Sequence, residues 1–192
     1  MIQSPHTRPW MQTRTGKRYY FDAPSEAAID IRDVASGLAK TCRFNGQCED
    51  FISVAEHSVA VSRLVEKRHN DAMLSYAALL HDASEAFMGD VSTPHKSLID
   101  MEGYRTREAV AMRSIEKQFR IPRGMTHDPR VKAADLDCLA VEAQYCFGKL
   151  DPGWMAWLAG AKTEDVNSPA CLDWREAEKL FLERFKLLKA KL

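Results

Sequence analysis

Apolar residues recur every three to four positions along most of this chain, and that spacing constrains its fold more than any other feature. The spacing is typical of helices that bury one face, whereas the alternation typical of half-buried strands is nearly absent. It predicts helices over residues 53–67, 71–88, 97–119, 129–147, 154–161 and 172–192, and a further helix that starts near Ser25. We therefore expect an all-α bundle.

Local signals mark several of the expected helix ends. Ser53 begins a capping box, and Asp128 stands directly before a proline, which is typical of a helix start. Gly89 is a natural stop for the helix before it. Between helices, the sequence predicts loops over 41–51 and 90–96.

The first 24 residues lack the helical spacing. We expect residues 1–24 to form an irregular arm with a short hairpin around 15–21, followed by one helical domain over 25–192. A length of 192 residues suits a single domain, and a hydrophobic content of 45% excludes global disorder. The basic stretch 8–18 is interleaved with aromatic residues, and we expect it to be solvated.

Charge and cysteine content narrow the class of protein. Lys and Arg together number 27, as do Asp and Glu, so the formal net charge is zero, which argues against a stable nucleic-acid complex. No apolar run is long enough to cross a bilayer, and no secretory signal precedes the domain. The odd number of cysteines predicts reduced thiols and a cytoplasmic location. The cysteines are Cys42, Cys48, Cys138, Cys146 and Cys171.

His57 is the first candidate for chemistry. It lies on the apolar face of the helix expected over 53–67, three residues after Val54 and four before Val61, so it points inward. The alternative is a buried neutral histidine that is hydrogen-bonded to a backbone carbonyl.

His81 and Asp82 follow an apolar helical run directly. Burying an imidazole and a carboxylate together costs several kcal/mol unless something compensates, and a metal ion compensates both. Glu85 lies one turn after His81, where it could orient water or act as a general acid or base. The alternative is a polar turn that faces solvent.

The helix expected over 129–147 carries two acidic candidates. Asp135 and Asp137 lie about 200° apart around the helix, so we expect only one to face the interior. The periodicity does not choose between them, and both could be solvated.

The spaced set His57, His81-Asp82 and Asp135 resembles the H…HD…D motif of the HD-domain metal-dependent phosphohydrolases, which are helical bundles. The resemblance covers roughly residues 27–150 and points to the branch of bacterial 5′-deoxynucleotidases and phage dATP triphosphohydrolases. The further matching segments, in chain order, are Arg43-Phe44-Asn45, Val54-Ala55-Glu56-His57-Ser58, His81-Asp82-Ala83-Ser84-Glu85, Gly89-Asp90, Thr93-Pro94 and Lys132-x-Ala134-Asp135.

The resemblance implies roles for the residues around the metal. It chooses Asp135 over Asp137 and makes Glu85 the catalytic carboxylate beside an attacking, metal-activated water. Asp90 would contact the substrate or support that water. The implied ligands of one divalent ion (Mn, Co, Mg, Zn, Ni or Fe) are His57, His81, Asp82 and Asp135.

The resemblance also implies a substrate site. Arg43 would hold a phosphate, Phe44 would flank the nucleoside, and Lys96 and Lys132 match phosphate-binding lysines of triphosphate-hydrolysing relatives. Position 44 departs from the nucleotidases, which tend to have Trp there. The expected function is therefore hydrolysis of (deoxy)nucleotides, either 5′-monophosphates or dNTPs.

Two other functions are kept beside this one. The site could bind a signalling nucleotide without hydrolysing it, although Glu85 would then be superfluous. A cyclic-nucleotide phosphodiesterase ranks lower, because no second histidine cluster builds a two-metal site. We also expect a homo-oligomer, with tryptophans 154, 157 and 174 mostly buried against the bundle and an exposed subset available for packing.

Overall fold

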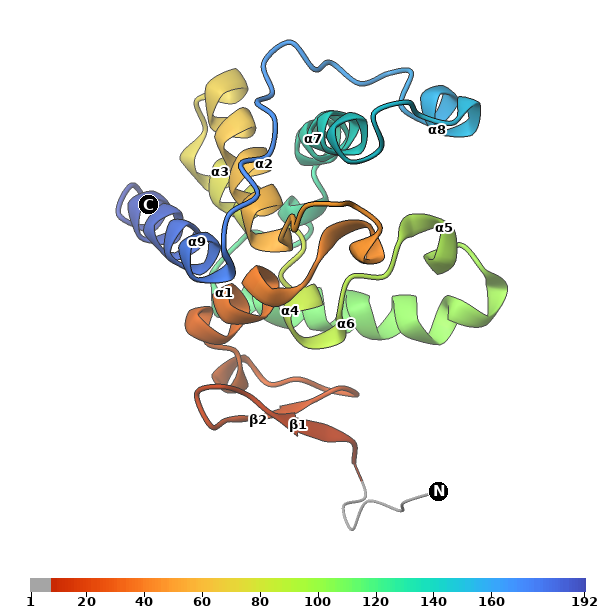
Figure 1. The fold of residues 1–192 in the computed structure, drawn as a ribbon. Helices are drawn as coiled ribbons and strands as arrows, with labels where there is room; N and C mark the ends of the chain where they lie inside the picture. Colours follow the sequence, from red (N-terminus) through yellow and green to blue (C-terminus); the bar gives the residue numbers. More distant parts are fainter. Residues whose placement is uncertain (1–7) are drawn as a thin grey trace.

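The computed structural model describes residues 8–192 and confirms the all-α class (Figure 1). Four short 3-10 helices are η1 (Glu26–Ala28), η2 (Arg43–Gly46), η3 (Ile99–Met101) and η4 (Met125–His127). The α-helices are α1 (Ile31–Lys40), α2 (Val54–His69), α3 (Ala72–Leu79), α4 (Glu85–Met88), α5 (Thr93–Lys96), α6 (Glu102–Gln118), α7 (Pro129–Phe147), α8 (Pro152–Trp157) and α9 (Trp174–Lys189).

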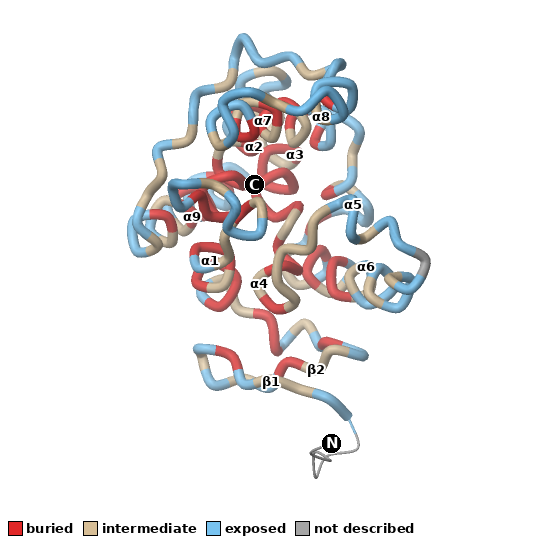
Figure 2. Tube along the Cα trace, turned by 45° about the vertical axis from the view of Figure 1, so that its right-hand side comes forward, coloured by how far each residue is buried: buried red, intermediate tan, exposed pale blue. Residues whose placement is uncertain are grey.

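Helix α2 lies at the centre of the bundle. It packs against α1, α3, α7 and α9, and α9 also crosses α1 and α3. The buried residues concentrate where these helices meet, whereas the outer surfaces of α6, α8 and α9 are exposed (Figure 2). The largest fully buried apolar side chains are Tyr19, Ile29, Leu38, Ile52, Leu74, Tyr76, Leu79, Leu80, Ile115, Phe181 and Leu188.

A small hairpin occupies the described part of the N-terminal arm, as the sequence predicted. Strands β1 (Trp10–Gln12) and β2 (Arg18–Tyr20) pair antiparallel at one end of the molecule (Figure 1). Tyr19 anchors the hairpin, because its ring is buried and stacks on Phe87 with the centroids 4.1 Å apart. Residues 1–7, including His6, lie outside the described residues.

Several expected helices begin or end elsewhere. The first α-helix starts at Ile31 rather than near Ser25, because Asp30 provides the cap by accepting a hydrogen bond from the Arg32 amide. The helix expected over 71–88 ends at Leu79, and a turn of i to i−3 hydrogen bonds leads to α4. In this turn, side chains that a regular helix would point in different directions around its axis lie together at the site.

Other boundaries follow the capping chemistry. Asp128 caps α7 and Ser53 caps α2, each by accepting a backbone N–H, as predicted. The expected loop 90–96 contains α5, and the helix expected from 97 begins at Glu102. The last helix starts at 174 rather than 172, because its cap is Asp173. Among the described residues, none of the helices is long and apolar enough to span a membrane.

Candidate metal centre

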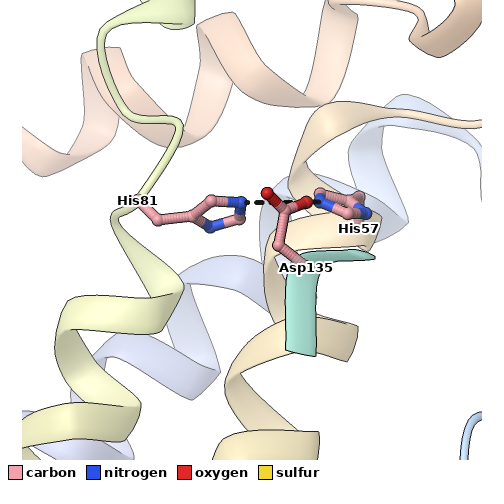
Figure 3. Close-up of side chains that lie close together, drawn as sticks. All are labelled: His57, His81 and Asp135. Carbon is pink, nitrogen blue, oxygen red and sulfur yellow. Dashed lines mark hydrogen bonds and ion pairs between the residues drawn. The ribbon is translucent and has the colours of Figure 1, made fainter. Parts of the chain in front are cut away.

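Three side chains from separate elements meet at the centre of the bundle. His57 comes from α2, His81 from the turn after α3, and Asp135 from α7 (Figure 3). One ligand atom from each lies within 4.8 Å of the others. The carboxylate of Asp135 lies between the two imidazole rings.

His57 is fully buried, and both of its ring nitrogens face carboxylates. Nδ1 lies 2.8 Å from Glu142 Oε1, and Nε2 lies 3.1 Å from Asp135 Oδ1. The alternative of a histidine bonded to a backbone carbonyl is therefore wrong for this residue. Burial lowers the pKa of His57, as does Arg43, but the charges of Glu142 and Asp135 outweigh both and raise that pKa.

His81 is held in one tautomer by the backbone. Its Nδ1–H donates to the Ala78 carbonyl at 2.8 Å, so Nε2 is free to act as a ligand. This Nε2 is buried without a hydrogen-bond partner among the described residues, although Asp82 Oδ2 lies 3.1 Å away. Burial lowers the pKa of His81, but the charges of Asp82 and Asp135 raise it to about 10.

The arrangement fits a divalent metal ion. With each Nδ1 facing an acceptor, both Nε2 atoms turn toward carboxylate oxygens. The cluster therefore needs positive charge at that point, which protons on the two rings supply and a divalent cation would supply in their place. Two imidazoles with carboxylates suit Mn, Fe, Co, Ni or Zn. Asp82 lies beside the trio, with Oδ2 at 3.1 Å from His81 Nε2 and 3.9 Å from His57 Nε2. The sequence prediction therefore names side chains that do lie together.

Glu142 was missed by the sequence reasoning. Its Oε1 faces His57, and its Oε2 accepts hydrogen bonds from Arg43 Nε at 3.1 Å and Nη2 at 2.9 Å. Such a carboxylate behind a metal-binding histidine orients the ring and raises its basicity. The sequence did contain a signal for Glu142: it lies seven residues, or two helical turns, after Asp135 and therefore on the same face of α7.

The pairing with Glu142 gives Arg43 a structural role beside the phosphate-binding role that the resemblance implies. The guanidinium is buried, and two of its three nitrogens are committed to Glu142. Burial alone would lower the pKa of Arg43, but the charges of the Glu142 carboxylate and of other nearby carboxylates together have the larger effect and raise this pKa above its ordinary value. Arg43 therefore stays charged.

A pocket of about 680 Å³ opens beside the histidines and contains the other predicted site residues. One end is charged, and the other is apolar. His95, which stands next to Lys96 in the chain, is exposed and does not line this pocket. The charged end is lined by Arg43, Asp82, Glu85, Asp90, Lys96, Lys132 and Asp135.

Glu85 is a buried carboxyl group at the charged end. Its Oε2 has no hydrogen-bond partner among the described residues, and its Oε1 lies 3.6 Å from Lys96 Nζ. Burial raises the pKa of Glu85 well above its ordinary value, and the charges of Asp82 and Asp90 add to this. Burial raises the pKa of Asp90 in the same way.

The two candidate lysines differ in their surroundings. Lys96 is partly buried, and its Nζ donates to Glu108 Oε1 at 2.6 Å. Burial alone would lower the pKa of Lys96, but the Glu108 hydrogen bond and the Glu85 charge together have the larger effect, so this pKa lies above its ordinary value. Lys132 is exposed at the rim, with Nζ 3.4 Å from Asp135 Oδ2.

The expectation that only one of the two acidic residues on α7 would face the interior is wrong. Asp135 is half-buried beside the histidines, and Asp137 is buried on the other side of α7, where it pairs with Arg68 and accepts the Lys162 amide at 2.7 Å. It therefore holds the chain that follows α8 rather than a metal. The spacing of apolar residues along α7 does not predict this burial, because it depends on Arg68, which lies on another helix far away in sequence.

The apolar end of the pocket is an aromatic wall, of which the sequence analysis assigned only Phe44 to the site. Two of its four rings, Trp154 and Trp157, come from α8, with centroids 5.2 Å apart. Trp157 is 44% exposed, so it belongs to the exposed subset of tryptophans, and it lines the pocket. Trp174 lies elsewhere, where Lys40 covers its ring. The aromatic wall consists of Phe44, Phe147, Trp154 and Trp157.

The cysteines contradict the prediction of reduced thiols for one pair. Cys48 and Cys146 form a disulfide that joins the loop after η2 to the last turn of α7. The loop folds back onto α7, and that proximity arises only in the tertiary structure. Cys42, Cys138 and Cys171 are free.

Two relatives resemble this chain over most of its length, while no protein-family model matches it. The uncharacterized protein YfdR of Escherichia coli (strain K12) is 32% identical over 176 residues, which cover 92% of this chain and 93% of YfdR. The uncharacterized protein RCAP_rcc00048 of Rhodobacter capsulatus is 33% identical over 169 residues, which cover 79% of this chain and 86% of the relative. The chain therefore belongs to the same protein family as YfdR.

Proposed function

We propose that this protein is a metal-dependent phosphohydrolase of the HD-domain type that removes phosphate from (deoxy)nucleotides. One observation carries the proposal. The trio of buried His57, buried His81 and half-buried Asp135 adjoins a pocket that combines cationic side chains and a buried carboxyl group with an aromatic wall. A nucleotide that is hydrolysed uses all three features: cationic side chains for its phosphate, a carboxyl group for proton transfer and an aromatic wall for its base.

The trio, together with Asp82, would hold the metal ion. A divalent cation at this position supplies charge neutralisation for phosphoryl oxygens and lowers the pKa of water. Burial raises the pKa of Asp82, but the positive charge and the hydrogen bond of protonated His81 together lower it by more, so this carboxylate is ionised. A bound cation would take over the role of that proton and keep Asp82 ionised as a ligand. The Ala78 carbonyl and Glu142 keep the two imidazoles oriented.

Glu85 is suited to proton transfer. A carboxyl group transfers protons efficiently when its pKa lies near the working pH, and burial moves Glu85 in that direction. Its unpartnered Oε2 can take a proton from water or give one to the leaving oxygen. A protein that only binds a nucleotide needs no such group, so this residue favours hydrolysis over sensing.

Cationic side chains around the pocket offer sites for phosphate oxygens. Lys96 is held by Glu108 and lies 3.6 Å from Glu85, so an anion bound there lies beside the proton-carrying group. Lys132 at the rim can reach a longer phosphate chain. The Nη1 nitrogen of Arg43 is the one not donated to Glu142.

The aromatic wall supports a nucleoside as the organic part of the substrate. Phe44 and Phe147 meet edge to face at 5.4 Å, and Trp154 contacts both. Bases stack on such rings with little regard to sequence, because each base has a π face. A sugar phosphate without a base would leave this wall unused.

The test is a panel of mono- and triphosphates of all bases, incubated with Mn²⁺, Co²⁺ or Mg²⁺, with the products separated by chromatography. We expect release of orthophosphate or triphosphate, and loss of release in Asp82→Ala. Asp165→Ala is the matched control, because its carboxylate is exposed and only pairs with Lys67.

The proposal fails if no nucleotide is hydrolysed with any of these ions, or if Asp82→Ala retains full activity. Nucleotide that binds but is recovered unchanged would identify a sensor instead. Circular dichroism of Asp82→Ala and of Asp82→Asn shows whether the loss is chemical or a failure to fold.

A further inference from the structure

The disulfide between Cys48 and Cys146 ties together two parts of the pocket wall. The two residues are 98 positions apart in sequence, and their Cα atoms are 4.8 Å apart. Gln47, directly before Cys48, and Phe147, directly after Cys146, both line the pocket. The bond therefore connects residues 43–48, which form η2 and the start of the loop after it (the η2 loop), to α7 at the aromatic wall.

The η2 loop has a backbone conformation that Phe44 does not favour. Phe44, Asn45 and Gly46 follow one another with φ angles of 54°, 52° and 72°, in the left-handed region. Glycine adopts this region freely and asparagine tolerates it, whereas a bulky residue such as Phe44 rarely does. Such a segment needs outside contacts to keep its shape. Besides the disulfide, Tyr145 Oη donates to Asp50 Oδ2 at 2.6 Å.

Both cysteines of the bond are half-buried, so a small thiol can reach them. Cys138 differs, because it is fully buried, and burial raises the pKa of its thiol. We propose that Cys48–Cys146 is a reversible thiol–disulfide site whose exchange partner is a low-molecular-weight thiol, and that its oxidation state controls how firmly the aromatic wall is held.

The exchange balances with two equivalents of the thiol. A thiolate attacks one sulfur of the bond, forms a mixed disulfide and releases the other cysteine as a thiol. A second thiolate resolves the mixed disulfide, so two protein thiols and one small-molecule disulfide are formed. Reoxidation by the small-molecule disulfide reverses both steps.

The consequence of reduction follows from what the bond holds. Without it, the loop that carries Phe44 loses its covalent link to the helix end that carries Phe147. His57 and Asp135 stay in place, because α2 and α7 pack against each other independently of that loop. Reduction therefore weakens base binding and leaves the metal cluster intact. The effect on nucleotides rests on the proposed function, whereas the exchange itself does not.

The experiment equilibrates the full chain with mixtures of reduced and oxidised glutathione. Alkylation and peptide mass spectrometry then quantify the oxidation of both cysteines, and circular dichroism checks the fold. Adenosine is the binding probe, because it carries a base but no phosphate, and tryptophan fluorescence reports its binding. We expect reversible exchange with an unchanged fold, and adenosine affinity about 3- to 10-fold weaker in the reduced protein, since reduction frees a loop that binding must then order.

Variants separate this site from the other thiols. Cys48→Ser with Cys146→Ser should bind adenosine weakly at every glutathione ratio. Cys171→Ser should keep the response, because a serine hydroxyl can still donate to Tyr145 Oη as the Cys171 thiol does. If the double variant does not fold, the reduced wild-type protein decides the question.

The proposal is overturned if the bond does not form, if it yields to glutathione only in denaturant, or if both oxidation states bind adenosine equally. A redox-dependent adenosine affinity without hydrolysis of any nucleotide would contradict the proposed function alone.

Discussion

Glu142→Gln tests the arrangement behind the candidate metal ligands. The carboxylate of Glu142 lies 2.8 Å from His57 Nδ1 and accepts two hydrogen bonds from Arg43. Arg43 is buried, with only 9% of its surface exposed. Removing one charge of a buried pair costs about 3–5 kcal/mol, because the other charge remains buried without its partner. Glutamine keeps the size and one acceptor oxygen, so we expect about 3 kcal/mol.

The same change should weaken metal binding. A neutral amide no longer raises the basicity of His57, and losing such an outer carboxylate lowers metal affinity by about 10- to 100-fold. Urea unfolding in EDTA measures the stability, and titration with Mn²⁺ in a calorimeter measures the affinity. Glu183→Gln is the matched control, because its side chain is exposed on α9 and should change stability by less than about 0.5 kcal/mol.

A double-mutant cycle completes the test. Arg43→Met combined with Glu142→Gln should cost less than the sum of the single changes, because the double variant buries no orphan charge. The reasoning is refuted if Glu142→Gln binds Mn²⁺ as tightly as the wild type and unfolds at the same urea concentration.

Three further predictions address other parts of the molecule. Trp157→Ala should raise KM for a nucleotide about tenfold without changing KM for a base-free sugar phosphate, because it removes a stacking surface; an equal change for both would contradict a base subsite. Gly37→Ala should cost about 1–3 kcal/mol in urea unfolding, because a Cβ would lie 2.5 Å from the Ala86 carbonyl oxygen, whereas Gly103→Ala on exposed α6 should be neutral or stabilising. Asp128→Ala should cost about 1 kcal/mol at pH 7 by removing the cap of α7. A side-chain hydrogen bond from Arg130 lowers the pKa of Asp128 from 3.8 to about 2. This carboxylate therefore stabilises the fold fully above about pH 4, and its contribution is lost as the pH falls through 2. The stability difference between variant and wild type should shrink over that range.

Local chemistry was enough to predict much of the fold. Helix α7 begins after Asp128 and ends before Gly148, and α2 begins after Ser53, because caps and stops act within a few residues of their own backbone. The helical class follows from a spacing that depends on neighbours three and four positions away. The pattern of histidines and acids also named the side chains that lie together at the centre.

The remaining features depend on contacts between distant parts of the chain. Arg43 meets Glu142 across 99 positions and Cys48 meets Cys146 across 98, so no local pattern reveals either pair. The break after Leu79 lets the adjacent residues His81 and Asp82, which a regular helix would point about 100° apart, lie together at the cluster. The sequence by itself determined the helices and the candidate ligands. Only packing decided which charges neutralise each other and which rings face the pocket, because burial and pairing are properties of neighbours in space.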